Sequence, residues 1–467
     1  MSTESVDFGI VGMGVMGKNL LLNIADNGFS VIGLDKDPEK IAPLVETGQS
    51  SVQATTSANE FLSSLESPRK IMMLVPAGAA VDAVIEELLP HLDEGDLLMD
   101  GGNSYFPDTD RRYQMLTEKG IQYMGVGISG GEEGARHGPS MMPGGSAKAY
   151  DMVGPILEAA AAKVDSEPCV TFIGKKSAGN YVKMVHNGIE YALMQLISES
   201  YHLMKSGFGL TDTDLKAVYD SWETGELSSF LMEITADIFG KKEEDGSDLI
   251  LNRILDSARQ KGTGKWTSQN AMDLQVPAPT IDMAVMVRDM SAHKKERIAA
   301  DAVFKNETEP VQVDEELIKK VEHALHFSFI TAFAQGFSMI KAASEAYNYG
   351  VNLADVAKIW RGGCIIRADM LEEFRRIFAE DPSINNIMVD DRLAGKLVEY
   401  QKDARYCIKI GLDAQIPLPA MMASVSYFDL YKSGWLPVNL IQAQRDYFGA
   451  HTYERTDKEG TFHTNWK

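Results

Sequence analysis

Three polar side chains that lie close together in the sequence have the types and the spacing for acid–base chemistry. Lys183, Asn187 and Glu190 occupy positions i, i+4 and i+7 of the segment KMVHNGIEY. On an α-helix this spacing places all three on one face, over about 10 Å at a rise of about 1.5 Å per residue. Such a face offers a base, an amide for hydrogen bonds and a second acid. The segment therefore predicts a catalytic helix face.

A glycine-rich turn near the N-terminus has the form GxGxxG. It follows an apolar strand candidate at 8–12 and precedes a helical pattern, and Asp35 lies 23 residues after the first glycine. Glycines in this arrangement permit a tight turn and let the backbone approach a pyrophosphate at a helix N-terminus. A purely structural glycine turn is the alternative. We favour a dinucleotide site, whose turn residues are Gly12, Met13, Gly14, Val15, Met16 and Gly17.

The acid after the second strand candidate bears on which dinucleotide binds. Asp35 would accept hydrogen bonds from the ribose hydroxyls of NAD and would repel the 2′-phosphate of NADP. Asp37 adds to that repulsion, whereas Lys36 opposes it unless it is a solvated turn residue. These three side chains together favour NAD over NADP.

A dinucleotide next to the helix face indicates hydride removal from an alcohol, with Lys183 as a base. Its pKa, ordinarily about 10.4, would have to fall to near 7, which costs the charged form about 4 kcal/mol. Burial and a nearby cationic nicotinamide could supply that. The alternative is a surface lysine paired with Asn187 or an acid. The adjacent His186 would be a substrate donor or a hydrogen-bonded core histidine.

Two further groups of residues have the composition of ligand-binding turns. Glycine-rich turns at 101–104 and 129–131 each follow a strand candidate, and Gly144-Gly145 comes soon after. Ligands bind at the carboxyl edge of a parallel sheet, although plain turns are the alternative. The loop QKGTGKW (260–266) has two lysines and a hydroxyl that suit a phosphate. Arg288 lies on a predicted helix, and the tail adds Arg445 and His451; singly, each is typical of a surface charge.

The order of patterns predicts an α/β Rossmann-type N-terminal domain, a large all-α domain and an extended C-terminal tail. Strand candidates alternate with helical patterns in the first part, and long 3.6-residue periods follow. We place the boundaries at 1–177, 178–434 and 435–467. The aromatic, polar tail would lie across a partner subunit or, equally, fold onto its own domain. The strand candidates lie at 8–12, 30–35, 70–75, 96–100, 121–128 and 170–174.

Composition excludes several functional classes. The 467 residues have a net charge of −22, which disfavours binding to nucleic acid or an anionic membrane. Three cysteines far apart in sequence, no signal peptide and no apolar run of 18 residues predict a cytoplasmic protein. His323 and His326 have no further ligand pattern around them, so we expect no metal site.

The chain closely resembles the decarboxylating 6-phosphogluconate dehydrogenase family along essentially its whole length. This resemblance implies a homodimer whose tail extends into the partner subunit, 6-phosphogluconate as the substrate, and NADP or NAD as the cofactor, with NADP the usual one. The resemblance rests on the segments GMGVMGKNLLLN, DGGNSYFPDTDRR, GISGGEEGARHGPSMMPGG, KMVHNGIEY, ILDSARQKGTGKWT, WRGGCIIR and NLIQAQRDYFGAHTYERTDKEGTFHTNW.

The resemblance also implies a role for each site residue. Lys183 would take the C3 hydroxyl proton during oxidation and return a proton to that oxygen after CO2 is lost, and Glu190 would protonate C1 of the enediol. The cofactor would contact Val75, Pro76, Ala77 and Asn103. The sugar acid would be held by Asn103, Ser129, Gly130, Gly131, His186 and Asn187. The phosphate would be held by Tyr191, Lys261, Thr263, Arg288 and, from the other subunit, Arg445 and His451.

The chain departs from the family pattern mainly at the cofactor. Asp35-Lys36-Asp37 stands where the family usually has Asn-Arg-Ser/Thr, and Pro76 stands where it usually has lysine. Asn180-Tyr181 and Ala192-Leu193 replace the usual His-Phe and Gly-Asp beside the catalytic helix face. These differences put the usual NADP preference in doubt and leave the predicted catalytic residues intact.

Two other functions fit part of the pattern. A β-hydroxyacid dehydrogenase for an unphosphorylated substrate would share the fingerprint and the lysine, but would not need the basic residues of the loop at 260–266 and the tail. A non-enzymatic nucleotide sensor would share the fingerprint, but would need neither Lys183 nor Glu190.

Overall fold

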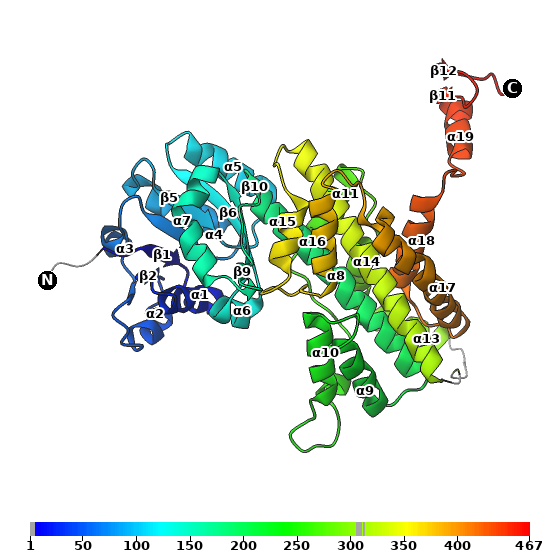
Figure 1. Ribbon diagram of the computed structural model, residues 1–467, viewed down its shortest axis with the longest axis horizontal. Helices are drawn as coiled ribbons and strands as arrows, with labels where there is room; N and C mark the ends of the chain where they lie inside the picture. The colour runs from blue at the N-terminus through cyan, green and yellow to red at the C-terminus, as the bar shows by residue number, and fades with distance from the viewer. Residues whose placement is uncertain (1–4, 305–310, 312) are drawn as a thin grey trace.

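The computed structural model describes residues 5–304, 311 and 313–467. An α/β domain, a helical domain and a projecting C-terminal segment follow one another along the molecule (Figure 1). The fold class predicted from the sequence is confirmed.

The N-terminal domain is built on an eight-stranded sheet with the order β10-β7-β6-β5-β4-β1-β2-β3. β1 pairs in parallel with both β2 and β4, so the crossover connections reverse direction beside β1. A ligand crevice is expected at that point in doubly wound sheets. The strands are β1 (Phe8–Val11), β2 (Val31–Leu34), β3 (Val52–Thr55), β4 (Lys70–Met73), β5 (Leu97–Asp100), β6 (Gln122–Ser129), β7 (Ser140–Gly145) and β10 (Gly174–Lys175).

The first five strand predictions agree with the structure to within two residues, but three features of the sheet were predicted wrongly. The candidate at 170–174 is a strand only at its end, where β10 begins, although Val170 makes an isolated bridge to Met141. β3 was missed because VQAT has few apolar residues. β7 was missed because SMMPGG contains a proline and two glycines, which ordinarily indicate a turn. β7 runs antiparallel to β6, so the sheet is mixed.

Helices cover both faces of this sheet, each over its own apolar cluster. One cluster joins α1, α2, α6 and α7 to the sheet, and the other joins α3, α4 and α5 to the opposite face. A short hairpin of β8 (Lys163–Val164) and β9 (Glu167–Pro168) follows. The helices are α1 (Val15–Asp26), α2 (Pro38–Val45), α3 (Ala58–Ser64), α4 (Ala79–Leu88), α5 (Phe106–Thr117), α6 (Gly131–His137) and α7 (Ala147–Ala160).

A single long helix, α8 (Ala178–His202), connects the two domains. Its first turns press against β6 and β7 through glycines. A side chain at Gly179 would collide with the carbonyl oxygens of Met142 and Gly125, and one at Gly127 would collide with the side chain of Lys183. Close backbone contact of this kind requires glycine. It fixes the start of α8, and therefore the predicted catalytic face, relative to the sheet.

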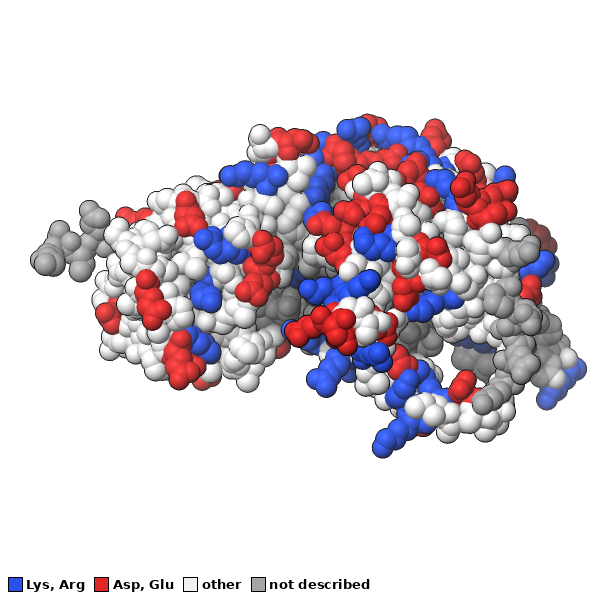
Figure 2. Space-filling view, turned by 90° about the horizontal axis from the view of Figure 1, so that it is seen from below, with Lys and Arg blue, Asp and Glu red and all other residues white. Residues whose placement is uncertain are grey.

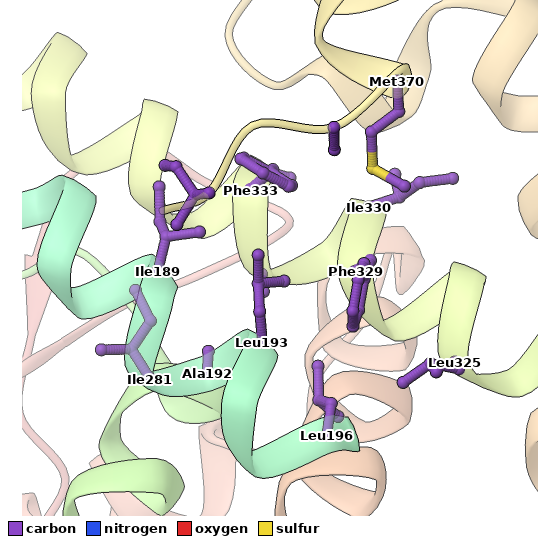
Figure 3. Packing of buried hydrophobic residues seen from close by; sticks show 14 of the residues in the cluster. Ile189, Ala192, Leu193, Leu196, Ile281, Leu325, Phe329, Ile330, Phe333 and Met370 are labelled. Atoms are coloured by element: carbon purple, nitrogen blue, oxygen red, sulfur yellow. The ribbon is translucent and has the colours of Figure 1, made fainter. Parts of the chain in front are cut away.

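The helical domain packs around α8. Ile189, Ala192, Leu193 and Leu196 of α8 face apolar side chains of α14, as Figure 3 shows. At 100° per residue this stripe lies on roughly the opposite side of α8 from the predicted catalytic face. The helices are α9 (Asp212–Glu223), α10 (Phe230–Gly240), α11 (Thr263–Asp273), α12 (Pro279–Ser291), α13 (Lys294–Val303), α14 (Glu315–Ala346), α15 (Leu353–Trp360), α16 (Met370–Glu380), α17 (Asp391–Asp413) and α18 (Pro419–Lys432).

The C-terminal segment extends away from the body of the molecule (Figure 1). It contains α19 (Asn439–Gly449) and a hairpin of β11 (Tyr453–Glu454) and β12 (Thr461–Phe462). The Asp446 carboxylate ties these parts together, since it accepts hydrogen bonds from the backbone nitrogens of Thr452 and Thr464 and from the Trp466 indole. Among the described residues, this segment does not pack onto the helical domain of its own chain.

Three whole-chain features agree with the composition. The three cysteines are free and buried. No helix within the described residues is long and apolar enough to cross a membrane. Figure 2 shows acidic and basic side chains interspersed on the face that it displays. The excess of acidic residues behind the net charge of −22 therefore forms no single acidic patch on that face.

Candidate active site

One cavity of about 1680 Å³ lies between the two domains and is lined by residues of both. The sheet contributes the carboxyl ends of β1, β2, β4, β5 and β6, as expected for a ligand crevice. The helical domain contributes α8, α11 and α12. Predicted site residues that line it are Gly12, Gly14, Val15, Met16, Asp35, Lys36, Val75, Pro76, Ala77, Asn103, Ser129, Gly130, Gly131, Lys183, Asn187, Glu190, Tyr191, Lys261, Thr263 and Arg288.

The glycine-rich turn has the geometry that a pyrophosphate needs. Gly12 has φ +97°, and a side chain there would lie 2.7 Å from the Leu74 carbonyl oxygen. A side chain at Gly17 would collide with the Gly12 carbonyl, so α1 packs tightly on the turn. The space above Gly14 is open, and Gly14, Val15 and Met16 line the cavity, so the free N–H groups at the start of α1 lie at the cavity. The turn therefore fits a dinucleotide.

Three residues predicted to bind the cofactor do not line the cavity. Met13 and Gly17 are buried in the turn, and the Met13 N–H donates to Asp35 over 2.8 Å. Asp37 is the N-cap of α2, where its carboxylate accepts the Glu39 N–H over 3.0 Å. An aspartate directly before a proline is a common helix start, so the sequence contained this signal.

The predicted catalytic residues share one face of α8, and a buried histidine orders them. The His186 ring lies 3.2 Å from the Ser129 hydroxyl through Nε2, and 3.4 Å from Lys183 Nζ and 3.1 Å from Asn187 Oδ1 through Nδ1. His186 itself is fully buried and does not line the cavity. Burial and the neighbouring lysine hold its pKa well below the usual value, so the ring is neutral. It orients the groups that face the ligand.

Burial perturbs both acid–base groups in opposite directions. The Lys183 side chain is almost fully buried, which lowers its pKa to about 8, although the charge of Glu190 opposes the change. Burial raises the pKa of Glu190, while Lys183 and Arg288 oppose that rise. Desolvation disfavours the charged form of each group. A lysine with a neutral fraction and a carboxyl group that holds its proton more tightly suit proton transfer near neutral pH.

The far end of the cavity is basic. Lys261, Arg259 and Arg288 line it, and none of them has a carboxylate within ion-pairing distance among the residues that the structure describes. The Arg288 guanidinium lies 3.4 Å from the centre of the Tyr191 ring, which holds it in place. The Thr263 hydroxyl lies beside them at the start of α11. This end of the cavity can bind an anion such as a phosphate.

The tail residues predicted at the phosphate do not lie in this chain's cavity. The Arg445 guanidinium donates to Gln442 over 3.1 Å, and the His451 ring packs at 5.9 Å from that of Phe448. Both lie on the projecting segment, so one chain alone does not bring them to Lys261.

The comparisons with known proteins agree over the full length of the chain. Residues 7–174 match the NAD binding domain of 6-phosphogluconate dehydrogenase, and residues 179–466 match the C-terminal domain of 6-phosphogluconate dehydrogenase. The chain belongs to the 6-phosphogluconate dehydrogenase family.

Individual members of the family are similar over nearly all of both chains. The NADP(+)-dependent, decarboxylating 6-phosphogluconate dehydrogenase of Bacillus subtilis (strain 168) is 50% identical, with 100% of each chain covered. The decarboxylating enzyme of Escherichia coli (strain K12) is 48% identical with the same coverage. The solved structure of Plasmodium falciparum 6-phosphogluconate dehydrogenase is 40% identical, has a TM-score of 0.96, and covers 98% of this chain and 100% of that one.

The structure of the present chain adds site residues that the sequence analysis missed. Arg259 was overlooked although it lies in the segment ILDSARQKGTGKWT, directly before the predicted basic loop. Side chains such as Lys40 and Glu87 at the nucleotide end are harder to find from the sequence, because they lie on helices that carry no motif. The further lining residues include Lys40, Thr56, Glu87, Arg259, Trp266 and Ile365.

A buried arginine behind the cavity connects two of its lining turns. The Arg112 side chain is fully buried and binds Asp82 of α4 through Nε over 2.8 Å and Asp100 of β5 through Nη1 over 3.3 Å. It also donates to the Gly78 carbonyl over 3.0 Å, and Asp100 accepts the Gly102 N–H over 3.1 Å. Arg112 therefore fixes the turn at 75–78 relative to the turn that presents Asn103.

The absence of a metal site stays a prediction. Within the described residues, no group of three histidine, cysteine, aspartate or glutamate side chains is placed to hold a metal ion. His323 and His326 instead pair with Asp403 and Glu226.

Proposed function

We propose that this chain oxidises and decarboxylates 6-phospho-D-gluconate to D-ribulose 5-phosphate and CO2, with reduction of a nicotinamide dinucleotide, in the cytoplasm. The observation that supports it best is a single cavity with three properties. It combines a turn that fits a dinucleotide, a buried lysine and a half-buried carboxyl group on one helix face, and a basic end that has no acid at ion-pairing distance in the described residues. Membership of the family supports the same reaction.

Lys183 serves the oxidation step. Its neutral amine accepts the proton of the C3 hydroxyl, so that the C–H bond at C3 can break with the electron pair leaving as hydride. The bound nicotinamide supplies the hydride acceptor. Asn187 and Ser129 line the cavity beside Lys183 and hydrogen-bond the hydroxyl and carboxylate groups of the sugar acid.

Lys183 and Glu190 then serve the decarboxylation. The C3 ketone accepts the electron pair released when the bond to the carboxyl carbon breaks, and the Lys183 ammonium donates its proton to that oxygen. Glu190, seven residues further along α8, gives a proton to C1 of the enediol, and the neutral Lys183 amine takes up the hydroxyl proton as the C2 ketone of the product forms. Its raised pKa favours the protonated form that this step requires.

A second copy of the chain completes the phosphate end. Trp435, Leu440 and Phe448 of the C-terminal segment are 69%, 62% and 73% exposed, which is unusual for large apolar side chains on a projecting segment. Their burial against a partner would stabilise a homodimer and bring Arg445 and His451 to the partner's cavity, where they bind the substrate phosphate.

Two alternative functions are less well supported. A β-hydroxyacid dehydrogenase for an unphosphorylated substrate would not need the three cations at 259, 261 and 288, each of which lacks a carboxylate partner in the described part of the chain. A nucleotide sensor would not need a lysine whose burial lowers its pKa to about 8.

The test of the reaction is product analysis with purified protein. We expect reduced dinucleotide, ribulose 5-phosphate and CO2 in equal amounts from 6-phosphogluconate, and no reduction with gluconate at the same concentration. Reduction with gluconate or 3-hydroxyisobutyrate at a similar rate would favour the unphosphorylated alternative. Dinucleotide binding without reduction of any substrate would favour the sensor.

The test of the shared site is complementation between two variants. Lys183→Met is inactive because it has no base, and Arg445→Ala turns over poorly at low substrate because the partner's phosphate site is incomplete. In a mixed dimer, the Arg445→Ala chain retains Lys183 and receives an intact tail, so its activity returns. Co-expressed chains with different tags should show this gain after purification of the mixed dimer. A tail that serves its own chain would give no gain.

A further inference from the structure

We infer that the nucleotide end of this cavity selects NAD over NADP, with Asp35 and Glu87 as the specificity-determining residues. The inference rests on the proposed dinucleotide site and deepens it. Four charged side chains line this end, and they are arranged in two acid–base pairs, so each cation that the 2′-phosphate of NADP would meet lies beside a carboxylate.

The Asp35 carboxylate is fixed at the carboxyl end of β2. One of its oxygens accepts the Met13 N–H over 2.8 Å, and the other accepts the Asp37 N–H over 3.0 Å. Each carboxylate oxygen has two lone pairs, so both can still accept a ribose hydroxyl from the cavity side. A carboxylate in this position at the end of the second strand binds the 2′-hydroxyl of NAD.

Asp35 stays ionised at any neutral pH. Burial alone would raise its pKa, but the hydrogen bonds from Asp37 and Met13 and the charge of Lys40 together lower it below the usual value. The carboxylate side chain is only 12% exposed, so solvent screens its charge poorly. A phosphate with a charge of about −2 beside it would be strongly repelled.

Both lysines at this end are already partnered. Lys36 Nζ lies 2.7 Å from Glu87 of α4, on the other side of the nucleotide end. Lys40 Nζ lies 3.5 Å from Asp35 itself. The Lys36 side chain is 82% exposed, so its ion pair with Glu87 is weak. A 2′-phosphate that drew Lys36 away would still lie beside two carboxylates, those of Asp35 and Glu87.

The arginines that line the cavity are at its other end. Arg259 and Arg288 come from the helical domain, next to the predicted phosphate of the sugar substrate. Arginine is the residue best suited to bind a phosphate through two hydrogen bonds, and within the described residues the nucleotide end has none. Because the Bacillus subtilis relative is named NADP(+)-dependent, the family would contain members of both preferences.

The test measures binding of reduced dinucleotides without turnover. Titration of the purified protein with NADH and with NADPH, followed by nicotinamide fluorescence, should give a dissociation constant at least about tenfold lower for NADH. Competition by ADP-ribose and by its 2′-phosphate derivative should show the same order. Equal or tighter binding of NADPH would overturn the inference.

Two substitutions on different elements locate the selectivity. Asp35→Asn removes the charge that faces the ribose, and Glu87→Gln frees Lys36 for the 2′-phosphate. Each should reduce the ratio of the NADPH and NADH dissociation constants by about threefold to tenfold, mainly through tighter NADPH binding. Glu86→Gln is the matched control, because Glu86 is an exposed neighbour of Glu87 on α4 outside the cavity.

The outcomes separate this inference from the proposed reaction. If Asp35→Asn unfolds because Met13 and Asp37 lose an acceptor, Glu87→Gln still decides the question, since its only recorded partner in the described chain is Lys36. An unchanged ratio in Glu87→Gln and in a folded Asp35→Asn would refute the assignment of these residues. Weak binding of both dinucleotides would refute the dinucleotide site itself, whereas preferred NADPH binding with normal turnover of 6-phosphogluconate would refute only the inference.

Discussion

The two ends of the cavity differ in how their charges are compensated. At the nucleotide end, Lys36 and Lys40 are each paired with an acid that lines the same cavity. At the substrate end, Lys261, Arg259 and Arg288 have no such acid within the described residues. This cavity is therefore suited to the phosphate of a sugar substrate at one end, but not to the 2′-phosphate of NADP at the other.

The two ends also differ in how the chain builds them. The nucleotide end is made by short turns between strands and helices, and by the charged side chains beside them, within one domain. The substrate end is made by side chains from α8, α11 and α12 and, in the proposed dimer, from a second chain. Substitutions at one end should therefore leave ligand binding at the other end unchanged.

Among the variants proposed here, Lys183→Met should show the largest difference between its effect on turnover at the substrate end and its effect on NADH binding at the nucleotide end. Methionine fills a similar space but has no proton acceptor, so kcat should fall about a thousandfold or more. The dissociation constant for NADH, measured by fluorescence, should change less than about threefold. The value of kcat is measured by steady-state kinetics with 6-phosphogluconate. A variant that keeps more than a tenth of the wild-type kcat would remove Lys183 from the role of base.

Arg112→Met should weaken the fold behind both turns at the nucleotide end. It leaves Asp100, which is completely buried, without its positive partner, a change that typically costs about 3–5 kcal/mol. Thermal unfolding should show a clear decrease in Tm. The double variant Arg112→Met/Asp100→Asn should recover part of that loss, because the unpaired charge is gone. No recovery would mean that the packing of Arg112, rather than its charge, matters.

Lys261→Met should act at the substrate end alone. Loss of one of three cations at the predicted phosphate should raise KM for 6-phosphogluconate about tenfold, with little change in kcat or in the dissociation constant for NADH. Lys265→Met is the matched control, since Lys265 is an exposed lysine on α11 that does not line the cavity. Equal effects in the two variants would indicate general electrostatic attraction and not a site.

The smallest effect concerns pH. With the pKa of Lys183 lowered to about 8, the neutral amine increases about fivefold between pH 7 and pH 8 and then levels off. kcat/KM for 6-phosphogluconate should follow that increase, while NADH binding should not. A profile that still rises tenfold per pH unit at pH 9 would mean that burial perturbs this lysine much less than the structure indicates.

The sequence predicted the parts of this site that depend on local spacing. The GxGxxG turn and the face with Lys183, Asn187 and Glu190 follow from the geometry of a turn and a helix. Even so, Asp37 was assigned to the cofactor, although its position before Pro38 is a helix-start signal.

Features that depend on contacts between distant segments could not be predicted. The pairing of Lys36 with Glu87 joins residues about fifty positions apart, and the buried role of Arg112 depends on strands and helices of unknown order. β7 was missed for a similar reason, because only its pairing with β6 makes a strand of a segment rich in glycine and proline. Local propensity is overridden there by tertiary structure.

The glycine-lined contact between α8 and the sheet has a consequence for motion. Because Gly125, Gly144 and Gly179 bring backbone against backbone, the first turns of α8 and the strands β6 and β7 cannot separate without opening a gap that no side chain can fill. Their amide protons should be among the last to exchange with deuterium, and those of the projecting C-terminal segment among the first in an isolated chain. Opening of the cavity for product release would then come from the turns around the ligand, not from a hinge between the domains.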